Sequence, residues 1–447
     1  MCENKDSAEF SRIAHYFREV EFYSDSSPSF MPEYFSTNCY VSDAFWPANF
    51  LLRIGIRFHH LWPTFGIRNG IETIQGTQPA VCFAGLSVAD LIAVRDGLPA
   101  KNEHVTQYAI TFPASSVLNG GVAQVIQTGD LRAVLEEESG SKVVTSEDML
   151  RNQFRCTNVQ FDLFSDHVSQ PEWRWPYTGD YQHAITKIKE EGLEANPIPG
   201  LDLTEEKWSG IGIVVANQAE ALRLQYDILT LIDRGLVAPS HFDHILVCKR
   251  LPASLSSLSN SGAQQAIQDA CYDFKSCLAI SDDETAAALQ DFSSRVAQLE
   301  LLYPISAAKE TGGCWVSFDD NTRPYVRALL KAGRIKVNRL GRYLGSLDEL
   351  DASRDLRERQ GLVKNLCKQL QEVHGVMCSY YSVPDSWSVD DHPFYCGKPW
   401  RGLYRITDEP DGVDEEEDED EWDDEDEEDE DNESGVDGEE EDGEAWR

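Results

Sequence analysis

The stretch Trp208-Ser-Gly-Ile-Gly-Ile-Val-Val-Ala216 decides the fold of the central region. It is almost continuously apolar, which predicts a buried strand. Asn217 follows, with Glu220 three residues later; this capping-box spacing starts a helix, and Gly235 ends it. A second strand is predicted from His244 to Cys248. A strand, a helix and a strand in this order predict a βαβ unit with parallel pairing and a right-handed crossover.

The turn after the first strand of this unit argues against a nucleotide-binding Rossmann site. Residues 215–219 contain no glycine, and Gly210 and Gly212 lie early in the strand, where they cannot hold a pyrophosphate. We therefore interpret the unit as a packing or regulatory α/β module.

The region before the βαβ unit mixes short strands with few helices, which predicts an α+β domain over residues 50–185. Its first strand is predicted from Leu52, where Ile54, Ile56 and Phe58 alternate with other residues, and it ends at His59-His60. Residues 1–49 show no clear periodicity and are interpreted as an irregular lead-in. Further strands are predicted at residues 79–85, 107–112, 122–127, 158–164 and 172–175.

The remaining chain divides by composition. The βαβ module takes residues 186–251, and a Ser-rich linker follows at 252–262. Residues 263–407 predict a helical and α/β C-terminal domain. Residues 408–447 predict a disordered acidic tail, because blocks of like charge repel one another and cannot pack a core.

The charge of the chain is concentrated in that tail. Its 447 residues carry a net charge of −39, of which the tail, with 27 acidic residues and one base, contributes −26. The other 407 residues carry −13. This balance excludes a free-standing nucleic-acid binder that works by neutralising phosphates. A cluster of bases between Arg323 and Arg342 suggests two alternatives: a solvated face, or a surface that receives the protein's own acidic tail.

Targeting and cysteine signals point to the cytoplasm. No run of about 18 apolar residues predicts a membrane span, and the N-terminus lacks the pattern of a signal peptide. The 11 cysteines include no CxxC pair, so we expect reduced thiols rather than a disulfide framework. No metal site is predicted: His241, His244 and Cys248 come closest, but strand alternation would point them in different directions.

Glu172 is the first candidate for chemistry. It lies beside tryptophans in Gln170-Pro-Glu172-Trp-Arg-Trp175, at the start of a predicted strand, and a carboxylate among large apolar rings is partly desolvated. The alternative is a surface glutamate paired with Arg174 at a strand edge.

Arg57, His59, His60 and Tyr108 are the candidates for binding. A strand end can present a polar group to a ligand while its neighbours stay in the core. Adjacent histidines in a strand point to opposite faces, so at most one of the two shares a cleft with Arg57. For all four residues a structural role is the alternative. GxSxG, HExxH and Walker motifs are absent, and Cys82 has no basic neighbour in sequence that would activate it as a nucleophile.

Taken in order, these segments resemble a known family. The order runs from Arg57-Phe-His59-His60 through Gln78-Pro-Ala-Val-Cys-Phe83, Tyr108-Ala-Ile-Thr-Phe-Pro113 and Gly120-Gly-Val-Ala-Gln-Val-Ile126 to Gln170-Pro-Glu172-Trp-Arg174. It is similar to that of the bacterial abortive-phage-resistance proteins of the AbiGi-like type, and more distantly to that of the ADP-ribosyltransferase fold. The resemblance covers residues 50–180.

The resemblance implies an enzyme that uses NAD as a substrate. Glu172 would be the catalytic carboxylate, with Gln170 as its partner on the acceptor side, and Arg57, His59, His60 and Tyr108 would contact NAD. The expected function is phage defence or toxin–antitoxin activity, with ADP-ribose transferred from NAD to a macromolecular acceptor. The alternative is a non-catalytic, antitoxin-like or inhibitory protein whose acidic tail binds a basic partner surface.

Overall fold

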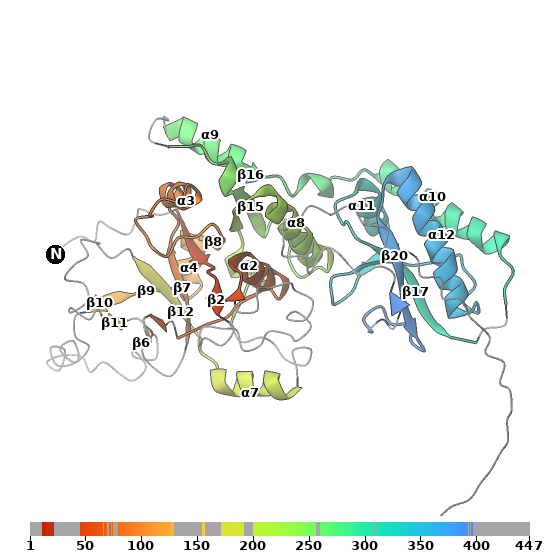
Figure 1. Ribbon diagram of the computed structural model, residues 1–447, viewed down its shortest axis with the longest axis horizontal. Helices are drawn as coiled ribbons and strands as arrows, with labels where there is room; N and C mark the ends of the chain where they lie inside the picture. The colour runs from red at the N-terminus through yellow and green to blue at the C-terminus, as the bar shows by residue number, and fades with distance from the viewer. Residues whose placement is uncertain are drawn as a thin grey trace, which may run out of the picture. The chain divides into compact units, whose positions relative to one another are not determined.

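The computed structural model describes most of the folded chain (Figure 1). The described residues are 11–21, 45–65, 67–68, 71–72, 74, 79–128, 154–156, 171–191, 200–255, 260–306, 309–391, 393 and 395–396. Gln170, the strand predicted at 158–164 and the acidic tail at 408–447 lie outside these residues.

A mixed eight-stranded sheet runs through the first half of the chain. The predicted segments 50–185 and 186–251 both contribute to it, because the strand at 211–215 pairs with the strand at 109–113. The two segments therefore share one sheet and one core instead of forming two domains. In order across the sheet, its strands are β16 (Cys271–Tyr272), β15 (Phe242–Val247), β14 (Ile211–Val215), β8 (Ala109–Pro113), β1 (Arg12–Tyr16), β7 (Ala80–Gly85), β12 (Glu172–Pro176) and β9 (Ala123–Gln124).

The predicted βαβ unit is confirmed. β14 and β15 pair in parallel, and α8 (Gln218–Asp233) connects them. Asn217 Oδ1 accepts from the Glu220 amide at 3.1 Å, and Glu220 Oε2 accepts from the Asn217 amide at 3.3 Å. This reciprocal capping box satisfies amides that the first turn of the helix would otherwise leave unpaired.

The strand predicted from Leu52 is wrong, because this segment forms a helix, α2 (Ala48–Arg57). Residues 50–56 are all buried, and an apolar run of this length does not distinguish strand from helix by its period. Arg53 and Arg57 lie one helical turn apart, and the Arg53 Nε atom donates to Asp227 Oδ2 of α8 at 2.9 Å. The contact with Asp227 of the distant helix α8 thus favours the helical conformation of residues 48–57.

The interpretation of residues 1–49 as an irregular lead-in is also corrected, because β1 occupies the centre of the sheet. It pairs antiparallel with β7 on one side and with β8 on the other. β1 is only five residues long, and its strand partners lie roughly 70 to 100 positions away in sequence, so local periodicity does not reveal it.

Two hydrophobic layers cover the sheet. Ile13, Ile110 and Ile213 belong to the core that includes α2 and α8, whereas their neighbours Ala14, Ala109 and Val214 belong to a core that includes α3 and α9. This alternation is what a two-sided sheet requires. The covering helices are α3 (Val88–Arg95), α4 (Ala114–Asn119), α7 (Tyr181–Glu191) and α9 (Asn260–Ala270). Helix α9 begins within the segment predicted as a Ser-rich linker.

A second, antiparallel sheet forms the C-terminal region, with the order β18 (Ile335–Val337), β19 (Tyr343–Gly345), β17 (Gly312–Phe318), β20 (Cys378–Pro384) and β21 (Tyr395–Cys396). Its helices α10 (Asp282–Leu302), α11 (Pro324–Lys331) and α12 (Leu356–His374) share a separate hydrophobic core with the sheet. The predicted α+β class is confirmed at this level.

Four two-stranded sheets, made of eight short strands, complete the strands of the described residues. The pair of β4 and β13 matters most below, because it brings residues 60–61 beside residues 201–202. These elements are β2 (Val20–Glu21), β3 (Phe45–Trp46), β4 (His60–Leu61), β5 (Ile67–Arg68), β6 (Ile71–Glu72), β10 (Ile126–Thr128), β11 (Phe154–Cys156) and β13 (Leu201–Asp202).

The basic cluster predicted at 323–342 is largely paired within the folded chain. Arg327 binds Asp233, Lys331 binds Asp282, and Arg334 binds Asp348 and Glu349. Arg323 binds Asp320. Arg327 and Arg334 are buried, so these bases are neutralised inside the folded chain and do not form the predicted solvated face. Docking of the tail on this cluster stays a prediction.

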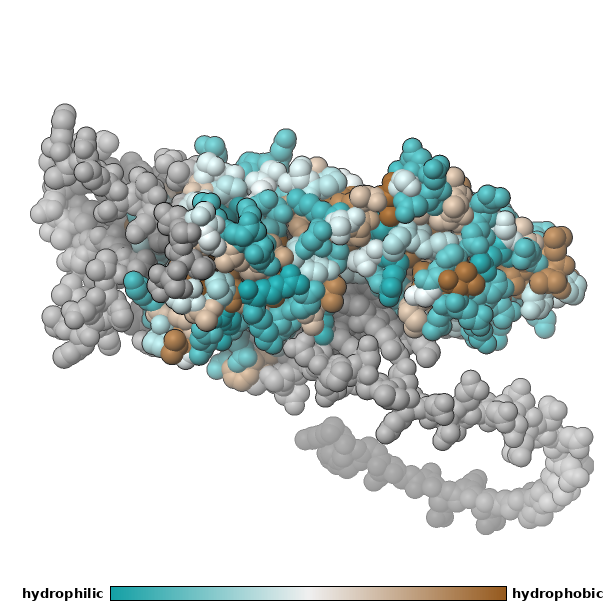
Figure 2. Space-filling view, turned by 90° about the horizontal axis from the view of Figure 1, so that it is seen from above, coloured by the Kyte–Doolittle hydropathy of each residue, from teal (hydrophilic) through white to brown (hydrophobic). Residues whose placement is uncertain are grey.

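The visible surface is polar. Figure 2 shows one face of the molecule, on which hydrophilic residues predominate and apolar ones occur in small groups. Within the described part of the chain, every helix is too short or too polar to cross a membrane.

We predict that Asp233→Asn strongly destabilises the fold. Its carboxylate accepts two bonds from Arg327, at 2.5 and 2.9 Å, and one from the Tyr343 hydroxyl at 2.7 Å. Both side chains of the ion pair are buried, with 7% and 4% exposure. The variant leaves a buried guanidinium without its counter-charge, so we expect a loss of about 3 to 5 kcal/mol in the free energy of unfolding, measured by urea denaturation.

The matched control is Arg323→Gln, which breaks an exposed ion pair with Asp320 (54% and 38% exposed). We expect it to cost less than about 1 kcal/mol. Equal effects of the two variants would contradict a special role for the buried pair.

Candidate functional site

Glu172 lies at the start of β12, where its side chain is fixed by a buried arginine. Its Oε1 atom accepts from Arg174 Nε at 2.8 Å. Glu172 keeps 15% of its side chain exposed, whereas Arg174 keeps 1%. Glu172 therefore pairs with Arg174, as one alternative predicts, but β12 is not an edge strand, because β7 and β9 flank it. Its side chain is largely buried, as the other alternative predicts.

The Cys82 thiol of β7 lies beside this pair. β7 and β12 are antiparallel neighbours, and Cys82 is directly opposite Arg174 in the register. Burial raises the pKa of Cys82 to about 12, and the charge of Glu172 acts in the same direction. Cys82 is therefore a protonated thiol at neutral pH, as expected from its apolar sequence context.

His15 lies in β1, the strand between β8 and β7 in the sheet. Ala14, Ala84 and Glu172 form one row across β1, β7 and β12, and directly paired residues share a face. His15 follows Ala14, so it lies on the opposite face from Glu172. Its ring packs edge-on against Phe17, with the centroids 4.9 Å apart, and its Nδ1 atom is 2.9 Å from the Cys82 carbonyl oxygen.

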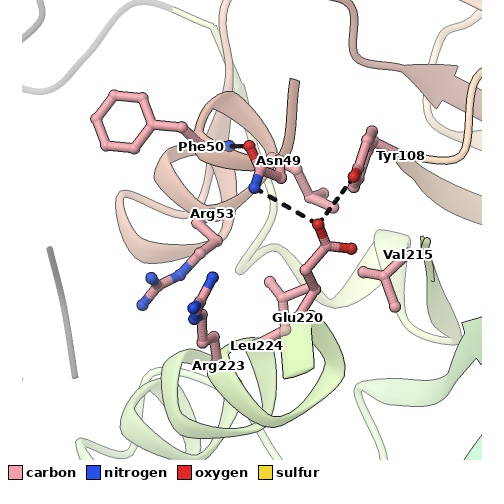
Figure 3. Close-up of a pocket in the computed structure, with 9 residues that line it drawn as sticks. Asn49, Phe50, Arg53, Tyr108, Val215, Glu220, Arg223 and Leu224 are labelled. Atoms are coloured by element: carbon pink, nitrogen blue, oxygen red, sulfur yellow. Dashed lines mark hydrogen bonds between the residues drawn. The ribbon is translucent and has the colours of Figure 1, made fainter. Parts of the chain in front are cut away.

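Tyr108 lies in a small pocket at the start of α8 (Figure 3). Its hydroxyl donates to Glu220 Oε1 at 2.8 Å, and Asn49 Nδ2 approaches the same oxygen at 3.5 Å. Glu220 Oε2 accepts from the amides of Ala216 and Asn217. The pocket has room for about one water molecule, so Tyr108 anchors the helix cap.

Arg57 lies at the last turn of α2, and one of its contacts is with the C-terminal region. Its Nη2 atom donates to the Leu340 carbonyl oxygen at 3.3 Å. Glu172, Tyr108 and Arg57 thus each hold a different partner: Arg174, Glu220 and Leu340. The predicted NAD-binding residues are not gathered around Glu172 by these contacts.

His59 and His60 form a separate cluster with Asp202, a residue that the sequence reasoning did not select. The His59 Nδ1 atom lies 3.1 Å from Asp202 Oδ1, and the two histidine rings are 4.8 Å apart. Burial of the carboxylate alone would raise its pKa, but hydrogen bonds from His59 and Thr204 hold the pKa of Asp202 well below its usual range. Burial lowers the pKa of His60. These three side chains are the described group that could hold a metal ion.

The expectation that adjacent histidines face opposite ways does not hold at this position. His59 has a φ of 49°, in the left-handed region, which turns the chain between α2 and β4. His59 directly follows Phe58, the C-cap of α2, where a left-handed residue commonly ends a helix. The usual sequence signals for this position, glycine or asparagine, are absent here.

The three weaker metal candidates are separated. His241 Nε2 binds the Leu203 carbonyl oxygen at 2.6 Å, His244 binds Asp243 at 2.9 Å, and Cys248 is buried after β15. The described cluster whose ligand atoms lie close together does not include them.

A larger cavity of about 290 Å³ lies in the C-terminal region and was also missed by the sequence reasoning. Trp315, Trp387 and Arg359 contribute to its wall, and the Arg359 guanidinium lies 4.8 Å from the centroid of the Trp387 ring. This cation–π contact orders the wall of the cavity.

Comparison with known proteins adds one match. Residues 281–401, about a quarter of the chain, match a family described as a protein of unknown function (DUF4427). This segment contains most of the C-terminal sheet with its three helices, and the larger cavity. Nothing matches among curated proteins or among solved structures.

His15 predicts a pH dependence of stability. Burial lowers its pKa from about 6.5 to about 4, so between these pH values the unfolded chain binds the extra proton. Stability should therefore fall as the pH decreases from 6.5 to 4. We expect His15→Gln to reduce this dependence by up to about 1.4 kcal/mol per pH unit, measured by urea denaturation across the range.

His183 on α7 is the matched control, because it is exposed. His183→Gln should leave the slope of the wild type unchanged. A His15→Gln variant with the same slope as wild type would show that His15 titrates normally in the folded protein.

Proposed function

We propose that the N-terminal sheet transfers ADP-ribose from NAD to a macromolecular acceptor in a phage-defence or toxin–antitoxin system. Glu172 is the catalytic carboxylate of this proposal. The observation that carries it is the position of Glu172: β12 holds it beside β7, the strand of the Pro-Ala-Val-Cys-Phe segment, and β7 lies beside β1. Three segments of the resemblance, those with β7, β12 and β9, are thus neighbours in one sheet, whereas β1 separates the segment with β8 from them and Arg57 lies in α2.

The chemistry requires a fixed negative charge. As the glycosidic bond between the ribose C1′ atom and nicotinamide breaks, positive charge develops on the ribose, and a carboxylate held close to it lowers the barrier. The acceptor nucleophile then bonds to C1′ and loses its proton to a base, while nicotinamide leaves with the bonding electrons. Arg174 is a positioning residue, because its buried guanidinium orients Glu172.

The roles first expected for Arg57 and Tyr108 are not part of this proposal. Both side chains already hold parts of the structure together, Arg57 at Leu340 and Tyr108 at Glu220. Residues that fix a helix cap are poor choices for a ligand contact, since binding would have to break the cap.

Because Arg57 and Tyr108 hold partners other than Glu172, a second candidate is a non-catalytic binding protein. If the residues that resemble a nucleotide site only stabilise the core, the surface that binds a partner lies elsewhere in the chain. The tail at 408–447, with its net charge of −26, is then the segment that engages a basic partner.

We predict that purified wild-type protein consumes labelled NAD, or transfers its label to itself or to a cell extract, and that Glu172→Gln lowers this rate at least about 100-fold. The substitution keeps the shape of the side chain and removes its charge, which leaves the buried Arg174 guanidinium without a counter-charge, so the rates are compared at a temperature where circular dichroism shows both proteins folded. Glu206→Gln, at an exposed position in the 3₁₀ helix before β14, is the control and should keep full activity. Equal rates for wild type and Glu172→Gln across protein, DNA and RNA acceptors would refute the transferase.

For the second candidate, we predict that a chain ending at residue 407 loses binding to the basic partner while its unfolding midpoint is unchanged. The interaction of the full chain should weaken with added salt, because the tail acts through exposed charges. Binding that survives removal of the tail, measured by co-purification at two salt concentrations, would contradict this role.

A further inference from the structure

We propose that His59, His60 and Asp202 bind a divalent transition metal ion of the Zn²⁺ type. One ligand atom of each residue lies within 4.8 Å of those of the other two. All three residues are partly exposed, so an ion can reach them from solvent. This site is independent of the proposed transferase, which uses Glu172 and needs no metal.

The backbone clamps the two parts of the site together. β4 and β13 pair antiparallel with Asp202 directly opposite His60, and the Leu203 amide donates to the His59 carbonyl oxygen at 2.6 Å. Gly200 makes this approach possible, because a Cβ atom at that position would lie 2.2 Å from the Leu61 carbonyl oxygen. Two segments about 140 residues apart thus hold their side chains in a fixed register.

The conformation of His59 brings both histidines to one place. Consecutive residues of a strand point to opposite faces, but the φ of 49° at His59 places the two rings 4.8 Å apart. A left-handed residue commonly follows a helix C-cap, as His59 follows Phe58 of α2. The end of the helix therefore brings both rings together before any ion binds.

The hydrogen bonds of the two histidine rings indicate which nitrogen of each could bind a metal. His60 Nδ1 lies 2.7 Å from the Phe58 carbonyl oxygen, which can only accept, so this nitrogen carries the proton. In His60, Nε2 is then the unprotonated nitrogen, which is the form that binds a metal. Histidine ligands are commonly oriented by such a hydrogen bond from their other nitrogen. His59 Nδ1 lies 3.1 Å from Asp202 Oδ1, so at His59 the metal ion would take the place of the proton between these two atoms.

Asp202 is oriented as well. The Thr204 amide and hydroxyl both donate to its Oδ1 atom at 2.8 Å, and His59 approaches the same oxygen. The two Thr204 bonds orient the carboxylate. It can therefore supply a charged ligand while keeping both of them.

The chemical types of the three ligand atoms determine which metal ion fits the site. Two imidazole nitrogens and one carboxylate oxygen suit Zn²⁺ and its neighbours, whereas Ca²⁺ and Mg²⁺ prefer ligand sets made only of oxygen. Ligands at about 2.1 Å around a tetrahedral ion lie about 3.4 Å apart, a separation that modest side-chain rotations would reach from the observed arrangement. Three protein ligands leave a fourth position for water.

The test uses the full chain, freed of metal by a chelator and titrated with Co²⁺. Carboxylates of the acidic tail would give the weak absorption of six-coordinate Co²⁺, whereas a site with two histidines and four or five ligands gives intense visible bands. We expect one equivalent of the intense form, which Zn²⁺ displaces.

Single substitutions test whether the intense Co²⁺ bands come from His59, His60 and Asp202. His60→Gln should weaken Co²⁺ binding at least 10-fold. His59→Asn removes the second imidazole with a residue that tolerates a positive φ, so a loss of the bands in this variant does not come from misfolding. His183→Gln, on α7, is the matched control and should keep them, as should Glu172→Gln, because the site does not depend on the transferase. The proposal is overturned if the wild type shows only the weak six-coordinate form, or if His60→Gln and His59→Asn retain the intense bands.

Discussion

Helix α8 imposes the constraint on which the rest of the described structure depends, because it carries three buried carboxylates that all need partners. Glu220 at its first turn binds the Tyr108 hydroxyl, Asp227 in its middle binds Arg53, and Asp233 at its end binds Arg327. An unpaired charge in such surroundings costs several kcal/mol. The helix therefore fixes the position of β8, α2 and α11, each of which supplies one partner.

This constraint explains why residues that look like ligand contacts in the sequence turn out to be structural. A tyrosine before a strand, or an arginine near a pair of histidines, gives the same local pattern whether its partner is a nucleotide or a distant group of the same chain. Tyr108 lies 112 residues before Glu220, and Arg57 lies 283 residues before Leu340. Separations of this kind are invisible to periodicity, and without an alignment nothing in the sequence links the partners.

Signals that act within one turn or one strand were predicted well. The Asn217–Glu220 capping box follows from local chemistry, and the parallel pairing of β14 with β15 follows from the helical crossover that connects them. β1 and α2 were not predicted, because their conformations depend on what covers them. Asp202 could not have been selected either, since its register opposite His60 exists only after β4 and β13 have paired.

The faces of the sheet limit where nucleotide chemistry could take place. Glu172 shares a row with Ala84 and Ala14, and Ala14 packs in the core that includes Leu91 of α3. His15, one residue further along β1, lies on the face covered by α2 and α8. A ligand that contacts Glu172 therefore cannot reach His15 without passing through the sheet. Any nucleotide must lie on the face of Glu172 and approach from the side of β12 and β9, since in the other direction that face is already covered by α3.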